Sequence, residues 1–290
     1  MDSASLKQRA KHVGADLVGI ADPALFAAEP ASRNPLAIFP ECRAVIVLGR
    51  RILRGALRGV EEGTNFGSTY RYFGYTWLED NFLSQTSYDL TCWIEERGRE
   101  AVPLFGYSEE GMPKGAPVAE GKPALNVHVD VELAAQAAGL GEIGLGGFFI
   151  TPEYGIRQRF CLILTDAELE PDAPSTKNIC GDCGECAAAC PFGAIDAETP
   201  RTVGVPGREY QVASVDYAIC RQCPNGAQQA SGRGSRPDRL AAACARACLV
   251  KLETAGKCTQ RFEQPFRKRE PWVLDAFNRP AQAPDAGSNA

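Results

Sequence analysis

Four closely spaced cysteines give the clearest indication of chemistry in this chain. Between residues 180 and 191 the sequence reads Cys-Gly-Asp-Cys-Gly-Glu-Cys-Ala-Ala-Ala-Cys-Pro. Intervals of two, two and three residues, with a proline directly after the last cysteine, are typical of a run that ligates [4Fe–4S] clusters. A zinc ribbon fits this spacing badly, because it needs two Cys-x-x-Cys pairs set well apart. Since the fourth thiolate of such a run reaches a second cluster, the run predicts more cysteines elsewhere.

The downstream cysteines supply the second half of a two-cluster ferredoxin pattern. They are separated by two, twenty and three residues, and the long middle interval contains a turn-rich insert, residues 224–237. Such an insert is tolerable, because lengthening a loop between fixed ends costs little free energy. We therefore expect crossed ligation by two sets of thiolates. The first cluster takes Cys180, Cys183, Cys186 and Cys248, and the second takes Cys190, Cys220, Cys223 and Cys244.

Four further cysteines remain outside this pattern. Cys42, Cys92 and Cys161 lie in apolar stretches, where a free cysteine usually packs as a small hydrophobic residue. Cys258 stays open as a substitute ligand for either cluster, since Leu249 follows Cys248 where the pattern has a proline. Disulfides are not expected, because no secretory leader is visible and cluster assembly requires reduced thiols.

The composition of the whole chain narrows the class of protein. The 290 residues carry a net charge of −5, so no overall basic field would attract nucleic acid. No apolar run reaches the roughly 18 residues that a membrane span requires. Residues 1–14 lack a signal pattern, and we therefore expect a cytoplasmic protein. With two histidines in the chain, metal chemistry has to depend on thiolates or on a bound cofactor.

The elements that position the cysteines follow from hydrophobic patterning. Residues 44–48 are continuously apolar, which is typical of a strand inside a sheet that is covered on both faces. Further strands are predicted at 16–20, 101–104 and 157–165, helices from Ser3 and over 87–97 and 130–138, and a loop over 50–69. We expect an α/β (α+β) cofactor- and substrate-binding domain over residues 1–172. A ferredoxin-like domain with two clusters is expected over 173–260, followed by a tail over 261–290.

Two stretches before the cysteines are candidates for a binding site. Residues 70–77 contain Arg71 and three tyrosines, and their aromatic density fits either core packing or the wall of a pocket. Residues 139–147 contain five glycines but follow a helix, so they do not form the strand–turn–helix fingerprint of a dinucleotide site. These glycines indicate close backbone approach, either to a neighbouring element or to a flat cofactor.

Several of these segments together resemble one family. The set comprises residues 14–20, 39–49, 139–144, 150–159, 164–166 and the run from Cys180, and it is similar to the epoxyqueuosine reductase and reductive dehalogenase family. The resemblance implies a nitroreductase-like domain that holds a cobalamin and a dicluster domain that feeds it electrons. It places a corrinoid beneath the glycine-rich turn, with Gly139, Gly141, Gly144, Gly146 and Arg159 as cofactor-binding residues. Arg157 and Tyr75 are the implied catalytic residues, which stabilise or protonate the product.

The resemblance also implies an activity and its partners. It predicts an iron–sulfur oxidoreductase that reduces a small-molecule substrate with electrons from a ferredoxin, a flavodoxin or a reductase. Counting to the acidic proton donor of epoxyqueuosine reductases gives Leu125 in this chain, and the chain has no C-terminal helical repeats that would help to hold tRNA. Two alternatives stay open: an electron-transfer or activator protein without corrinoid chemistry, and reduction at a flavin or at a cluster.

Overall fold

The N-terminal half of the chain forms an antiparallel sheet of four strands. The computed structural model describes residues 1–105, 115–124, 127–181, 183–228 and 236–283. The strands are β1 (Leu17–Ala21), β2 (Ala44–Arg51), β3 (Ala101–Phe105) and β6 (Gln158–Thr165), in the order β1-β2-β6-β3. Each neighbouring pair is antiparallel. The predicted strands are therefore confirmed, within a residue or a few of the expected bounds.

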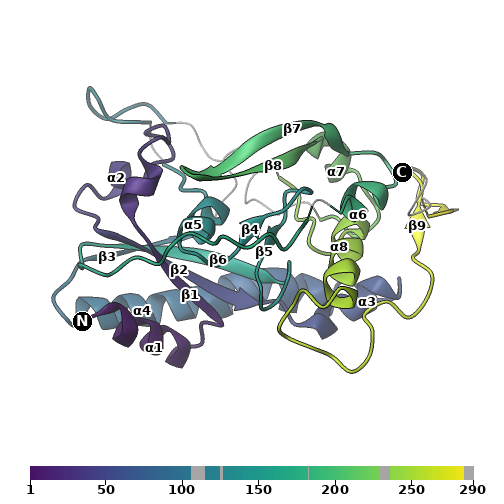
Figure 1. Ribbon diagram of the computed structural model, residues 1–290, viewed down its shortest axis with the longest axis horizontal. Helices are drawn as coiled ribbons and strands as arrows, with labels where there is room; N and C mark the ends of the chain where they lie inside the picture. Colours follow the sequence, from purple (N-terminus) through teal and green to yellow (C-terminus); the bar gives the residue numbers. More distant parts are fainter. Residues whose placement is uncertain (106–114, 125–126, 182, 229–235, 284–290) are drawn as a thin grey trace.

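Helices cover both faces of this sheet, as the apolar run at 44–48 indicates. Helices α1 (Ser3–His12) and α4 (Ser84–Glu95) lie along one face, and α5 (Val131–Ala137) lies on the other (Figure 1). Successive side chains of β2 point to opposite faces of the sheet. Ile46 packs in the core beneath α1 and α4, whereas Val45 packs in the core with α5. This arrangement buries β2 on both faces, which explains why its sequence lacks polar alternation.

Some local predictions differ from the structure. The N-cap of α1 is Asp2 rather than Ser3, because the Asp2 carboxylate accepts the backbone N–H of Ser5 at 2.8 Å. The segment expected to be a loop over 50–69 contains η2 (Arg54–Leu57) and α3 (Arg58–Glu61). These two short helices bury Leu57 and Val60 against the cysteine-rich part. The local sequence pattern did not predict these two helices, because burial against the rest of the fold stabilises them more than helix propensity does.

The remaining elements of the N-terminal half are short. They are η1 (Pro23–Phe26), α2 (Pro35–Ile38), the π-helical stretches η3 (Arg71–Thr76) and η4 (Leu78–Leu83), and the hairpin strands β4 (Glu142–Ile143) and β5 (Phe149–Ile150). The aromatic segment divides between core and surface: Tyr70 and Tyr75 are buried, whereas Tyr72, Phe73 and Trp77 are exposed. Core packing therefore applies to Tyr70 and Tyr75, and the pocket wall stays a prediction.

The cysteine-rich part lies at the opposite end of the molecule from the N-terminus (Figure 1). It contains the short helices α6 (Glu185–Ala188) and α7 (Tyr217–Arg221), and the long helix α8 (Ala243–Thr254). Between α6 and α7 runs the hairpin β7 (Ile195–Val205) and β8 (Arg208–Val215), which extends back over α5. One continuous core joins residues 52–78, residues 148–156 and the cysteine-rich part, so this core crosses the boundary expected at residue 172.

The segment after residue 260 packs on the rest of the protein. It includes the short pair β9 (Val273–Leu274) and β10 (Pro280–Ala281), and its Phe266 side chain is 2% exposed. The Trp272 indole N–H donates to the Val60 carbonyl at 2.8 Å. Across the described ranges, we find no helix with the length and apolar character that a membrane span requires.

Candidate functional site

The first expected set of thiols gathers where α6 meets α8. Helix α6 follows Gly184, whose φ of 72° lies in the left-handed region that favours glycine, and the helix packs against α8. The pKa of the Cys248 thiol lies well above its ordinary value, because the thiol is buried and Cys186, Cys180 and Cys183 lie nearby. The structure thus brings together Cys180, Cys183, Cys186 and Cys248, as the crossed assignment requires.

The glycine-rich turn packs directly over this first set. A Cβ atom on Gly146 would stand 2.6 Å from the Cys186 Sγ, and one on Gly144 would stand 3.3 Å from the Cys180 Sγ. Between these glycines, the Leu145 backbone N–H donates to the Cys180 Sγ at 3.4 Å. Glycine is needed at these positions because the backbone of the turn touches the thiols. The sequence indicated close backbone approach to a neighbouring element or a cofactor, and the cysteine run is such a neighbouring element.

The second expected set of thiols lines a cavity between α7 and α8. Cys190, Cys220, Cys223 and Cys244 all contribute to its wall, together with Arg239. Burial raises the pKa of Cys220 to about 11, and Arg239, Cys244, Cys190 and Cys223 are the groups whose charges act on it most after burial. The Ala194 backbone N–H donates to the Cys190 Sγ at 3.3 Å.

The two sets fit the demands of iron–sulfur clusters. Backbone N–H donors to cysteine sulfur and an apolar enclosure are features that surround such clusters and tune them. Burial holds the pKa of Cys186 at about 12, so without a metal these thiols would stay protonated. Among the described residues, no three His, Cys, Asp or Glu side chains are arranged in a group that could hold a metal ion.

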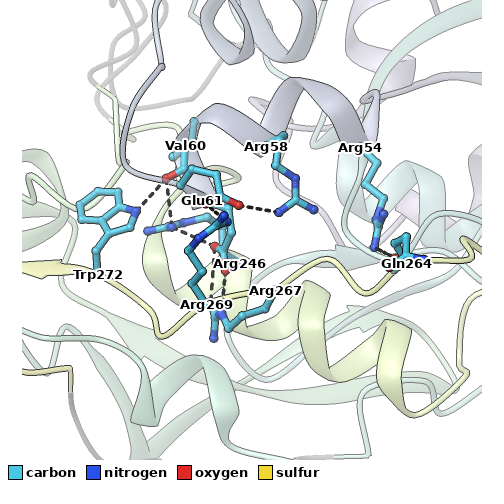
Figure 2. A network of polar contacts seen from close by, with 10 residues as sticks. Arg54, Arg58, Val60, Glu61, Arg246, Gln264, Arg267, Arg269 and Trp272 are labelled. Atoms are coloured by element: carbon cyan, nitrogen blue, oxygen red, sulfur yellow. Dashed lines mark hydrogen bonds and ion pairs between the residues drawn. The ribbon is translucent and has the colours of Figure 1, made fainter.

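A buried ion pair fastens α8 to the N-terminal half. Arg246 lies on α8 between Cys244 and Cys248, and its guanidinium donates to the Glu61 carboxylate at 2.9 Å. Arg267 donates to the same carboxylate at 2.6 Å from the C-terminal segment (Figure 2). Figure 2 also shows Trp272 beside this pair, at the carbonyl of Val60. The helix that carries one thiol of each set is thereby held against α3.

Arg157 is part of the protein core. It is 1% exposed, and its guanidinium donates to the Ile52 carbonyl at 2.9 Å and to the Gln260 Oε1 at 2.6 Å. It therefore links β6 to the chain after α8. Cys258 lies close by, since Arg157 is a main charge acting on its buried thiol and Gly155 would contact its sulfur if it carried a Cβ. Cys258 therefore lies beside Arg157. The thiols that affect one another's pKa values are those of the two sets.

Arg159 and Tyr75 belong to a second buried network. The Arg159 guanidinium pairs with Asp238 at 2.9 Å and with Glu79 at 3.5 Å, and it lies 5.0 Å from the centre of the Tyr75 ring. The Tyr70 hydroxyl donates to the same Asp238 carboxylate at 2.7 Å. Burial and the Asp238 charge raise the pKa of Tyr70 far above its ordinary value. The network connects the π-helical segment to the loop before α8.

The positions assigned to a corrinoid make contacts within the protein. A Cβ on Gly139 would meet the Ala173 carbonyl at 2.4 Å, and one on Gly141 would meet the Ile150 carbonyl at 2.1 Å. Gly144 and Gly146 face the first set of thiols, and the Arg159 guanidinium forms ion pairs with carboxylates. As arranged, these five residues do not fit a macrocycle seated on the turn. The corrinoid stays a prediction from the resemblance, and Leu125 lies outside the described residues.

Sequence reasoning missed the residues that surround the thiols. Glu61, Asp238, Arg239 and Arg246 were not singled out. Arg246 carried a usable signal, because it is the one charged residue between two ligand cysteines on an otherwise apolar helical stretch. The others gave no local signal, since their partners lie far away in the sequence.

Comparison with known proteins identifies relatives of two kinds. No family model matches the chain. A tetrachloroethene reductive dehalogenase of Desulfitobacterium hafniense is 40% identical over 92 residues, which is 31% of this chain and 16% of that protein. An epoxyqueuosine reductase of Gloeobacter violaceus is 46% identical over 61 residues, or 21% of this chain and 19% of that protein. The matched region thus spans less than a fifth of the length of these relatives.

Solved structures of both kinds share the fold. A catabolic reductive dehalogenase aligns over 99% of this chain and 41% of its own, with a TM-score of 0.56 and 17% identity. An epoxyqueuosine reductase from Bacillus subtilis aligns over 92% of this chain and 68% of its own, with a TM-score of 0.51 and 17% identity. By local sequence and by fold, the chain is similar to proteins of the epoxyqueuosine reductase and reductive dehalogenase family.

Proposed function

We propose that this protein is a reductive oxidoreductase whose cysteine-rich part holds two [4Fe–4S] clusters. Cys180, Cys183, Cys186 and Cys248 would hold the first, and Cys190, Cys220, Cys223 and Cys244 the second. Such clusters, when bound, carry electrons one at a time. An external donor such as a ferredoxin, a flavodoxin or a reductase would supply the electrons, and a small molecule would be reduced.

The observation that carries this proposal is the sharing of α8 between the two thiol sets. Cys244 and Cys248 stand four residues apart on one helix, so they project from its same side about 6 Å apart along the axis. Cys186 of the first set also has Cys244 of the second set among the thiols that influence its pKa. The two clusters would therefore lie side by side, as an electron relay requires.

The first test is the iron and sulfide content of anaerobically prepared protein. We expect about eight irons and eight acid-labile sulfides per chain, and an EPR spectrum of two interacting clusters after reduction. Cys183→Ala, at the exposed ligand of the first set, should leave about four irons and the signal of the second cluster. Wild-type protein with about four irons would contradict the two-cluster proposal.

A second candidate function is electron transfer without a corrinoid of its own. It is favoured by the packing of the glycine-rich turn, where protein atoms occupy the positions that the family resemblance gave to the macrocycle. If the first candidate includes a corrinoid, the clusters would instead supply electrons to a cobalamin in the N-terminal half, and one reductive dehalogenase of similar fold carries out B12-dependent dehalogenation. In both, Arg157 and Arg159 support the fold rather than the chemistry.

Titration of cobalamin into the reconstituted, reduced protein separates the two candidates. A shift of the cobalt absorption bands that saturates at one equivalent would establish a corrinoid enzyme. An unshifted spectrum, in protein that holds eight irons, would establish the electron-transfer function. Free cobalamin in the same buffer, with bovine serum albumin in place of this protein, is the matched control.

A further inference from the structure

Arg239 lies on the wall of the second cavity and contacts the turn that packs over the first set of thiols. Arg239 is 6% exposed, and its Nη2 donates to the Gly146 carbonyl at 2.9 Å. Gly146 is the residue whose Cα faces the Cys186 thiol of the first set. The guanidinium lies 4.5 Å from the centre of the Phe148 ring and 5.6 Å from that of Tyr217. These contacts fix its place on the wall of the second cavity.

Arg239 has an unused hydrogen-bond donor beside the second set of thiols. Its Nη1 atom is buried and makes no hydrogen bond within the part of the chain that the structure describes. A buried donor left without an acceptor is costly, and Glu132 is the carboxylate among the charges that act on Arg239, ranked after the thiols Cys244 and Cys220. The cavity that Arg239 lines is walled by Cys190, Cys220, Cys223 and Cys244, and Cys244 and Cys220 are among the groups with which its charge interacts most strongly.

A bound cluster would bring further negative charge to the cavity that Arg239 lines. A [4Fe–4S] core with four thiolates carries a net negative charge, which increases by one when the cluster accepts an electron. A buried positive charge stabilises the reduced form more than the oxidised form, because the attraction grows with the charge of the cluster. Charge and hydrogen bonding around the sulfurs are among the factors that set cluster potentials.

We propose that Arg239 raises the reduction potential of the second cluster. The inference rests on the proposed function, since it needs that cluster to be present. Arg239 acts through electrostatics: it makes the one-electron reduction of the cluster, by a low-potential donor such as a ferredoxin or a flavodoxin, more favourable. Because its Nη2 also fixes Gly146, the same residue holds the turn over the first set.

The test is an EPR-monitored redox titration of R239Q in a C183A background, where only the second cluster contributes. At the midpoint potential of the parent protein, the ratio of reduced to oxidised cluster should fall at least tenfold in R239Q. For a one-electron couple this corresponds to about 59 mV. R236Q is the matched control, because Arg236 stacks on the same Tyr217 ring at 5.2 Å but is not among the residues that line the cavity. We expect R236Q to change the ratio less than threefold.

An unchanged potential in R239Q, with iron content equal to the parent, would overturn the inference and leave the two-cluster proposal intact. Absence of two four-iron clusters from the wild-type protein would instead contradict the proposed function itself. If R239Q loses the second cluster, R239H decides the matter. In R239H, protonation of the introduced imidazole should raise the reduction potential of the second cluster as the pH falls from 8 to 6. If the difference in potential between R239H and the parent does not change with pH, the inference is overturned.

Discussion

Arg246 and Glu61 form an ion pair at 2.9 Å in which the side chains are 1% and 4% exposed, although 185 positions separate them in the sequence. Arg246 also lies over the Trp272 ring, 4.6 Å from its centre, and donates to the Val60 carbonyl. The pair joins three segments: α3, α8 and the chain after residue 260. It is therefore one of the contacts that tie the cysteine-bearing helix α8 to the rest of the fold (Figure 2).

Replacing Glu61 should destabilise the protein strongly. Glu61→Leu leaves the Arg246 guanidinium buried without its carboxylate, and removal of one partner from a buried pair typically costs about 3–5 kcal/mol. Urea denaturation followed by circular dichroism gives the free energy of unfolding. Glu62→Leu is the matched control: Glu62 pairs with Arg58 and Arg269 at the surface, where such pairs contribute about 0–1 kcal/mol. Equal losses in the two variants would contradict the importance assigned to the buried pair.

Replacing Cys258 should leave both clusters in place. Its thiol lies beside Arg157 and Gly155, whereas the eight other assigned cysteines form the two sets. Cys258→Ser should retain about eight irons, and Cys248→Ser should retain about four. The measurement is the iron and sulfide content, with EPR to identify the cluster that remains. Loss of four irons from Cys258→Ser would show that a ligand has been assigned incorrectly.

Adding one methyl group at Gly146 should remove the first cluster. The new Cβ would stand 2.6 Å from the Cys186 Sγ, closer than real Cβ atoms approach other atoms, so the thiol or the turn has to move. We expect Gly146→Ala to retain about four irons and the signal of the second cluster. Gly55→Ala is the control, because a Cβ at that position meets no atom within 4 Å. Full iron content in Gly146→Ala would show that the turn yields without disturbing the thiols.

Glu132 should give the stability of the protein a pH dependence near neutrality. Burial raises the pKa of this carboxyl on α5 to about 7, with Asp130 adding to the effect, from an ordinary value of 4.5. Between these two pH values the folded protein binds more protons at this group than the unfolded chain does. Stability should therefore fall as the pH rises from about 4.5 to about 7, by about 1–3 kcal/mol. Glu132→Gln should flatten this dependence in urea denaturation measured at pH 5, 6 and 7.5, whereas an unchanged slope would mean that other groups cause it.

Patterns that are local in the sequence predicted the fold well. The strands around Val45 and Leu162 are readable because every residue in them is apolar, and this follows from their burial on both faces. The cysteine run predicts its ligand role equally locally, since a cluster would impose short ligand intervals on one stretch of chain. The helices η2 and α3 were missed, because they exist through burial against residues far away in the sequence.

The surroundings of the thiols could not be predicted for the same physical reason. Glu61, Asp238 and Arg239 acquire their roles from partners that only the folded chain brings near. The glycine-rich turn shows most clearly what the sequence cannot predict. Its five glycines indicate that the backbone closely approaches a neighbour, but they do not distinguish a cofactor from the cysteine run as that neighbour.

The position of Cys244 and Cys248 on one helix also determines where the chain can tolerate insertions. The spacing of the two cluster sites depends on a single turn of α8 and not on the length of the loop that precedes it. That loop is closed at its base by two backbone hydrogen bonds between Gln228 and Asp238, at 2.9 and 2.8 Å. Residues inserted between these two positions would enlarge the loop without moving either thiol.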